Sequence, residues 1–442
     1  MDINSFDPAE RLGALRAAAE AASFPASGIN ANMHCHSFFS YNPDAMSPSA
    51  IALEGKKRAL VAVGLCDFDV LDGLDEFLAA GDILSLKVTA NIETRAYMEE
   101  FSDVDVNSPG EPGVVYMMGA GFPRVPKDGS NGKTILDGYK LGAGKRNEEL
   151  VARINAALPE IALDYSRDVA PLTPAGNATE RHIVSAYIAK AEERFGENAE
   201  LARFWAKVLG TSENNAAETI ADKLKLEDIV RAKLAKRGGI GYVQPTIDAF
   251  PKAKGFLQWV AACDAIPMLA WLDGTTPGES NADNLLDTAI GNGAASLNII
   301  PDRNWNIADP RTKAIKTAKL AEVVEAADKR LLPINVGTEL NKAGQPFNDD
   351  FETQALKPFK RTFIKGAMIF VGHTVLARFA DFAYKGAKAS AEFAEQAEMN
   401  DFFEKVGSAF APSIETTGKL RDAGPEKAFA ELADMAKTTE TL

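Results

Sequence analysis

Residues 32–40 read Asn-Met-His-Cys-His-Ser-Phe-Phe-Ser and continue an apolar run that predicts a strand at 29–34. Two of the four histidines of the chain, His34 and His36, stand two positions apart in this segment. In a strand, side chains i and i+2 point to the same face. We therefore expect both imidazoles at the carboxyl end of the strand, where they suit two adjacent ligands of one metal ion. Two polar residues that merely end a strand are the open alternative.

Similar short apolar runs recur along the chain, with helical stretches between most of them. The predicted strands are 29–34, 60–66, 86–92, 114–119, 267–272, 295–300, 332–337 and 367–372, and the predicted helices are 48–57, 73–81, 248–262, 281–292 and 311–329. Such alternation is typical of a parallel α/β architecture. Eight strands spread over more than 330 residues predict a closed barrel of the (β/α) type.

The remaining segments are predicted to be helical or loop. Residues 107–144 are rich in Gly, Pro and Ser and predict a loop, whereas 145–237 predict a helical insertion on one face of the barrel. Residues 375–438 are rich in Ala, Lys and Glu and predict helices outside the barrel. A helix is also expected near the start, opened by Asp7 with Pro8 at its first position. We expect one domain that spans residues 1–442.

The composition narrows the class of protein. The chain has 442 residues, 46% hydrophobic and 25% charged, with a net charge of −14, which is the balance of a globular protein. Its acidity argues against nucleic acid and membrane partners but leaves a small anionic or phosphorylated substrate open. Three cysteines predict neither a disulfide framework nor a zinc knuckle. The start lacks a secretory pattern and no apolar run is long enough to span a membrane, so a cytoplasmic location is expected.

Acidic residues end the next two predicted strands. Asp67 and Asp69 follow the run 60–66, and Glu93 follows 86–92. Carboxylates at neighbouring strand ends converge on the same barrel mouth as the histidines, and a mixed N/O set suits Zn, Mn or Fe. The alternative for the two aspartates, stronger for Asp69, is capping of the following helix. Glu93 has no helix to cap directly.

The segments NMHCHSFFSYNPDAMSP, AVGLCDFDVLDGLDEFLAAG and VTANIETR together resemble the opening motifs of the polymerase and histidinol phosphatase (PHP) superfamily. Weaker resemblance continues through GKRNEELVARIN, TERHIVSAYIAKA, IIPDRNWN and VGTELNKAGQPF, which look like a longer subgroup with a helical insertion. The resemblance implies a distorted seven-stranded β/α barrel. It also implies up to three metals at the carboxyl ends of the strands and hydrolysis of phosphate esters.

The chain departs from the family pattern at several ligand positions. Phe68 replaces the His of an Asp-His-Asp motif, and Trp271 lies near the place of an Ala-His-Pro. The first motif continues as Ser-Tyr-Asn rather than Ser-Asp-Gly, the run 114–124 offers no His, and Glu-Leu-Asn replaces the closing Asp-x-His. The remaining ligand candidates predict one or two ions, not three, and they are His34, His36, Asp67, Glu93 and Glu339.

Further residues follow predicted strands and are candidates for the mouth. Arg303 is predicted to clamp a phosphate or a carboxylate, with pairing to Asp302 or Asp309 as the alternative. Asp67 or Asp273 is predicted to orient or deprotonate water. The predicted substrate-binding residues are Arg303, Asn304, Asn341 and His373. His182, alone in a predicted helix, is expected to be a packing or surface residue.

Two functions of different classes remain open at this point. The first is a metal-dependent phosphoesterase in which a metal-bound hydroxide attacks phosphorus while Arg303 neutralises the phosphoryl oxygens. The second is a PHP-fold protein that has lost hydrolysis and binds a small anionic ligand at the barrel mouth. A third, weaker option is another metal-assisted reaction on a sugar acid or similar ligand.

Overall fold

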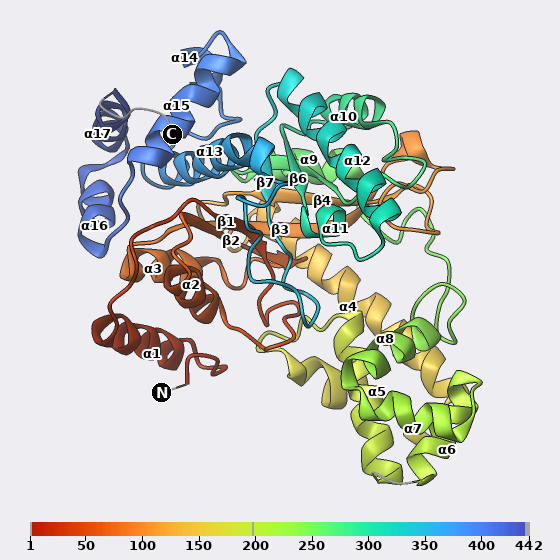
Figure 1. Cartoon of the computed structure of the whole chain (residues 1–442). Coiled ribbons are helices and arrows are strands. Elements are labelled where there is room, and N and C mark those ends of the chain that lie inside the picture. Colours follow the sequence, from red (N-terminus) through yellow and green to blue (C-terminus); the bar gives the residue numbers. More distant parts are fainter. Residues whose placement is uncertain (1, 197–198, 438–442) are drawn as a thin grey trace. The chain divides into compact units, whose positions relative to one another are not determined.

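The computed structural model describes residues 2–196 and 199–437. The ends of the predicted single domain and of the predicted C-terminal helices, and residues 197–198 of the predicted insertion, lie outside that description. The chain divides into two compact units (Figure 1). One comprises the residues up to 37, residues 42–136 and those from 250 onward, and the other comprises residues 38–41 and 137–249.

The first unit is built around one seven-stranded sheet whose strands are hydrogen-bonded in chain order. A parallel bridge between Cys35 and Glu339 joins the first strand to the segment after the last one. The sheet is thereby a nearly closed barrel, which confirms the predicted distorted (β/α)7-type fold. The strands are β1 (Ala31–Cys35), β2 (Ala62–Phe68), β3 (Lys87–Tyr97), β4 (Val114–Ala120), β5 (Ile266–Trp271), β6 (Ser296–Ile299) and β7 (Ile334–Val336).

One strand runs against the predicted direction. Residues 114–119 do form a strand, β4, but it is antiparallel to both β3 and β5. The physical reason is the connection from β3 to β4, which contains only the short turn η1 (Glu99–Phe101). A parallel neighbour needs a crossover, usually a helix, whereas an antiparallel neighbour can be reached directly.

The predicted eighth strand, residues 367–372, is wrong, because these residues lie within helix α13 (Lys360–Phe379). This helix is buried on nearly every side, and a fully buried helix shows no polar face by which periodicity could separate it from a strand. A Cβ on Gly366 would lie 1.9 Å from the carbonyl oxygen of Ile334, the first residue of β7. A glycine there lets α13 lie directly against the amino end of the barrel.

The other helices of this unit pack on the barrel strands or on the helices next to them. Helix α1 (Pro8–Ala21) begins as predicted, with Asp7 accepting a hydrogen bond from the N–H of Ala9. The predicted helices correspond to α2 (Pro48–Lys57), α3 (Leu74–Leu84), α9 (Ala253–Ala262), α10 (Ala282–Gly291) and α12 (Pro310–Lys329). The short α11 (Asp302–Trp305) precedes α12. After α13 follow α14 (Ala387–Glu392), α15 (Gln396–Ala409), α16 (Ile414–Ala423) and α17 (Pro425–Lys437).

The second unit is helical and has its own apolar core. The loop predicted for 107–144 is wrong in its second half, because α4 (Asn131–Ala157) begins there. Most of α4 belongs to this unit, and its other described α-helices are α5 (Glu180–Phe195), α6 (Ala199–Leu209), α7 (Glu213–Ala221) and α8 (Lys223–Leu234). Its buried side chains include Tyr187 and Trp205, which shows that the segment folds around its own contacts.

Candidate metal centre

The two histidines of the opening motif lie side by side, as predicted. His34 is in β1 and His36 directly follows its last residue, and both side chains are fully buried. Their Nε2 atoms are 3.2 Å apart. The N–H of His36 donates to the carbonyl oxygen of Glu339 at 2.8 Å, which fixes the backbone at the point where the barrel closes.

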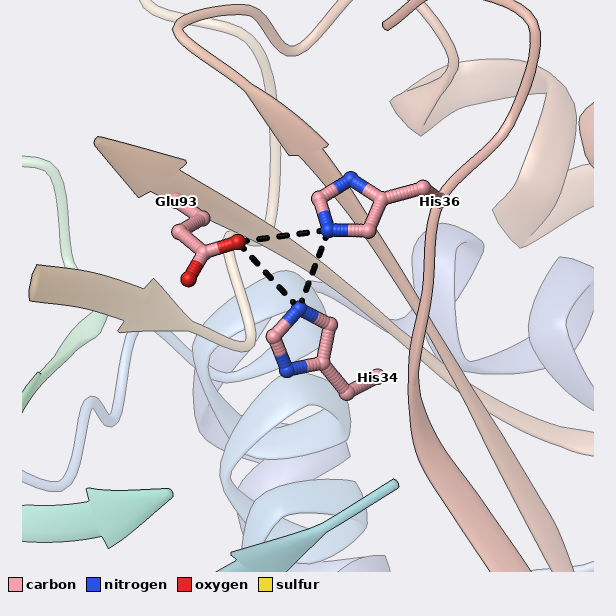
Figure 2. Close-up of side chains that lie close together, drawn as sticks. All are labelled: His34, His36 and Glu93. Atoms are coloured by element: carbon pink, nitrogen blue, oxygen red, sulfur yellow. Dashed lines mark hydrogen bonds and ion pairs between the residues drawn. The ribbon is translucent and has the colours of Figure 1, made fainter. Parts of the chain in front are cut away.

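Glu93, from β3, completes the group (Figure 2). Its Oε2 lies 3.4 Å from Nε2 of His34 and 3.2 Å from Nε2 of His36. These three residues offer one ligand atom each, all within 4.8 Å of one another and all buried. Glu93 therefore meets the two histidines as expected, but it lies within β3, which continues to Tyr97, rather than after the end predicted at residue 92.

The spacing of these atoms fits one metal ion. Ligand atoms about 2.0–2.1 Å from a tetrahedral zinc ion lie about 3.3 Å from each other, and the three distances here are 3.2, 3.2 and 3.4 Å. Two imidazole nitrogens and one carboxylate oxygen are also a donor set found in catalytic zinc sites. Three protein ligands leave a coordination position for water or substrate.

The charges of the group favour a cation. Burial opposes ionisation of Glu93, but the charges and hydrogen bonds of His34 and His36 lower its pKa to about 2. Burial likewise opposes protonation of His34, yet the Glu93 carboxylate raises the pKa of His34 above its ordinary value. The buried carboxylate is thus an anion that requires positive charge between it and the imidazoles, which a metal ion supplies as well as a proton does.

Asp67 lies at the end of β2 but does not belong to this group of three. It is buried, and its two carboxylate oxygens accept hydrogen bonds from Ser37, from the N–H at 2.8 Å and from Oγ at 2.7 Å. Its contacts fix the residue next to His36. It does not cap α3, because the residue before that helix is Gly73. Asp69 accepts a hydrogen bond from Thr94 instead.

Phe68 occupies the position where the resembled family has a histidine ligand. Its ring stacks on the imidazole of His36, with centroids 4.2 Å apart and planes inclined by 24°. On the neighbouring strand, its register partner is Glu93. One side of the group is therefore apolar.

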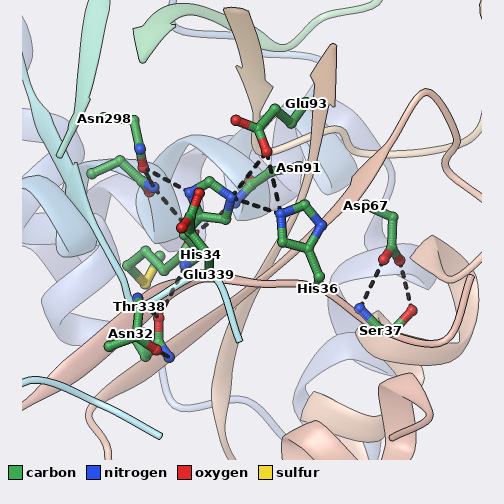
Figure 3. Close-up of polar contacts among 12 residues, drawn as sticks. Asn32, His34, His36, Ser37, Asp67, Asn91, Glu93, Asn298, Thr338 and Glu339 are labelled. Atoms are coloured by element: carbon green, nitrogen blue, oxygen red, sulfur yellow. Dashed lines mark hydrogen bonds and ion pairs between the residues drawn. The ribbon is translucent and has the colours of Figure 1, made fainter. Parts of the chain in front are cut away.

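Glu339 and Arg303 form an ion pair beside the group (Figure 3 labels Glu339 next to His34). Nη2 of Arg303 lies 2.8 Å from Oε2 of Glu339, whose charge also raises the pKa of His34. The Glu339 charge raises the pKa of the Arg303 guanidinium further, against the effect of burial. Glu339 is nearly buried, whereas 41% of the Arg303 side chain is exposed.

Asp273 and Asn304 have contacts of a structural kind. Asp273 pairs with Lys316 at 2.8 Å; burial opposes ionisation, but hydrogen bonds from Lys316 and Thr275 lower its pKa. Asn304 is fully buried, and its Nδ2 donates to the carbonyl oxygen of Lys316 at 3.1 Å. Both residues connect the end of β5 to α12.

The remaining predicted residues lie outside the group. Asn341 is half-buried and follows the left-handed pair Glu339 and Leu340. The strand-end placement of His373 is wrong, because it lies in α13, where its Nδ1 accepts a hydrogen bond from the N–H of Tyr384. His182 is a packing residue that takes part in the capping box of α5.

Sequence reasoning missed a layer of asparagines below the histidines. Asn298 in β6 and Asn335 in β7 are fully buried, and Oδ1 of Asn298 faces Nδ1 of His34 at 3.3 Å (Figure 3). A single asparagine within each of the apolar runs 295–300 and 332–337 indicates a site residue only if the inward face of the strand is known, because alternate residues of a strand point inward.

Comparisons with known proteins find solved structures of similar fold but no relative by sequence. No family model matches the chain, and no curated protein matches it. A candidate metal-dependent phosphoesterase from Bifidobacterium adolescentis superposes with a TM-score of 0.47 at 17% identity, covering 77% of this chain and 98% of that one. An amidohydrolase from Chromobacterium violaceum, with bound sulfate and no metal, superposes with a TM-score of 0.49 at 16% sequence identity. The match covers 75% of this chain and 95% of that one.

Every described helix is too short or too polar to cross a membrane.

Proposed function

We propose that this protein is a metal-dependent hydrolase of small phosphate esters, with one divalent ion, Zn, Mn or Fe, held by His34, His36 and Glu93. The observation that carries the proposal is the convergence of three buried donor atoms at 3.2–3.4 Å from one another. A metal ion in such a site supplies a Lewis acid and lowers the pKa of a water molecule.

The surrounding residues have positioning and electrostatic roles in this proposal. Asp67 holds Ser37 and so fixes the backbone next to His36. Because Ser37 engages both of its oxygens, and Lys316 engages Asp273, we assign no proton transfer to either carboxylate. The apolar ring of Phe68 covers one face of His36 and excludes water there, which strengthens the attraction between the ion and its ligands.

The choice of a phosphate ester rests on Arg303. Its guanidinium is partly exposed beside the buried group, and Glu339 restrains it through two of its nitrogens. A planar guanidinium matches the geometry of phosphoryl oxygens. Positive charge at this point is worth most where the negative charge of the transferred group increases in the transition state.

A second function, binding of a small anion without hydrolysis, is favoured by one observation. Phe68 stacks on His36 where the resembled family has a further ligand. With three ligands and an apolar neighbour, the site has fewer groups for stabilising a reacting phosphoryl group. In this alternative Arg303 binds the anion and the three ligands have no catalytic task.

The two functions differ in metal content and turnover. We would measure the metal content of protein purified without chelator, and phosphate release from an aryl phosphate. The wild type is compared with the double variant His34→Ala/His36→Ala and with His182→Ala, which removes a histidine of the second unit as a control. We expect stoichiometric metal and turnover in the wild type and in the control, and loss of both in the double variant.

Each outcome decides between the functions. Undiminished turnover in the double variant would refute the metal-dependent mechanism. Metal-bound protein without turnover, or metal-free protein that binds inorganic phosphate through Arg303, would support the binding function instead. The control separates loss of ligands from general damage, because His182 contacts Thr179 rather than the metal group.

A further inference from the structure

A row of hydrogen bonds leads from a backbone carbonyl to one ring nitrogen of His34. Nδ2 of Asn335 donates to the carbonyl oxygen of Met33 at 3.1 Å and to Oδ1 of Asn298 at 2.8 Å. The same Oδ1 lies 3.3 Å from Nδ1 of His34. All of these side chains are fully buried, so water does not compete with the contacts.

The carbonyl of Met33 sets the direction of the whole row. A carbonyl oxygen only accepts, so the amide atom of Asn335 that faces it must be the nitrogen. That nitrogen also faces Asn298, so the atom of Asn298 at this point must be the oxygen. This oxygen accepts as well, and the atom of His34 that meets it must therefore carry a proton. The orientations of both amides and the proton on Nδ1 follow from one backbone group.

We propose that Asn298 and Asn335 are positioning residues that keep the proton of His34 on Nδ1 and thereby reserve Nε2 for a metal ion. The inference rests on the metal site of the proposed function. Nε2 is the atom that faces His36 and Glu93. A neutral imidazole has one nitrogen that donates and one that accepts, so fixing the donor at Nδ1 leaves the ligand lone pair on Nε2.

Two unpaired atoms of the row indicate that its purpose is not stability. Nδ2 of Asn298 and Oδ1 of Asn335 are buried without a hydrogen-bond partner among the described residues. Burying an unpaired amide atom destabilises the folded state, and apolar residues of similar shape would avoid that cost. Asparagine at both positions is explained by what it does for His34.

The test measures Zn²⁺ affinity, by competition with a chromophoric chelator, and the ¹⁵N–¹H signal of Nδ1 of His34 at one fixed pH. Asn298→Leu removes the acceptor and should weaken Zn²⁺ binding about 10- to 100-fold, the range for outer contacts of metal ligands. The protected Nδ1–H signal should disappear with it. Asn298→Asp keeps an acceptor oxygen facing His34 and should restore both the affinity and the signal.

Asn91→Leu is the matched control. Asn91 is also a buried asparagine that donates to the carbonyl oxygen of Met33, at 3.0 Å, but its other amide atom accepts from Gly121 rather than from His34. We expect its Zn²⁺ affinity to stay within about threefold of the wild type, even if its stability falls. Equal losses in Asn91→Leu and Asn298→Leu, or no rescue by Asn298→Asp, would overturn the proposal.

The proposed function and this inference can fail separately. A protected Nδ1–H signal and the expected order of Zn²⁺ affinities in a protein without phosphatase activity would uphold the positioning role and reject hydrolysis. Phosphatase activity in a wild type whose His34 carries no proton on Nδ1 would uphold hydrolysis and reject the positioning role.

Discussion

The ring of Phe68 lies on the imidazole of His36, with the two centroids 4.2 Å apart. An aromatic side chain thus covers a metal-ligand candidate at the point where the resembled family has another imidazole. The contact gives this site its apolar side.

Replacement of Phe68 by His should strengthen metal binding, because it adds a nitrogen ligand next to His36. We expect Zn²⁺ to bind about tenfold more tightly, a gain of about 1.4 kcal/mol, as measured by competition with a chelator. Phe68→Leu is the control, since it removes the stacked ring without adding a ligand. If Phe68→His binds Zn²⁺ no better than Phe68→Leu does, position 68 cannot contribute a ligand in this barrel.

Arg303→Ala should impair turnover while metal content stays unchanged. Loss of the guanidinium removes positive charge beside the reacting phosphoryl group, and we expect kcat/KM to fall about 10- to 1000-fold. Arg124→Ala is matched in exposure: Arg124 is 46% exposed against 41% for Arg303, and its acidic partner is Asp381. A similar loss in both variants, or loss of metal from Arg303→Ala, would contradict the assignment of Arg303 to the substrate.

Ionisation of the buried Asp349 carboxyl group should make the protein less stable as the pH rises. Burial raises the pKa of Asp349 to about 7, although Nε1 of Trp305 donates to it at 2.6 Å. The folded state therefore keeps a proton that the unfolded state releases near pH 4. The free energy of unfolding is accordingly highest below about pH 4 and falls as the pH rises to about 7. The difference between these two pKa values corresponds to at most about 4 kcal/mol.

Asp349→Asn keeps an acceptor for Trp305 without the charge and should lack this loss. Urea unfolding at pH 4 and pH 8 measures the difference. The variant and the wild type should be similar at pH 4, and the variant should be the more stable protein at pH 8. Parallel pH dependence in the two proteins would show that Asp349 titrates at its ordinary pKa.

Gly366→Ala should destabilise the first unit strongly. The added Cβ would lie 1.9 Å from the carbonyl oxygen of Ile334, so α13 or β7 must move, at an expected cost of about 3 kcal/mol or more. Gly255→Ala, in α9, meets nothing within 4 Å and should stabilise the protein by about 0.5–1 kcal/mol. Thermal unfolding of the two variants checks the expected loss of stability in one and the expected gain in the other. A stable Gly366→Ala variant would show that α13 does not lie against β7.

The sequence by itself determined the local and periodic features of this protein. Alternating strands and helices predict the barrel, and the i, i+2 spacing of His34 and His36 puts both on one face because a strand alternates its side chains. Glu93 could be added because it follows the predicted strand 86–92. These inferences depend on residues that are close in the chain or on a repeated pattern of elements.

Only the tertiary structure decided the rest, because it depends on groups far apart in the chain. Nothing near Asp67 indicates that Ser37 engages both of its oxygens. The apolar run 367–372 lies in helix α13, whose residues are buried on nearly every side, and such burial removes the periodic pattern that separates a helix from a strand. The proton position on His34 depends on Asn298 and Asn335, more than 260 residues away, and on inward faces that no local pattern defines.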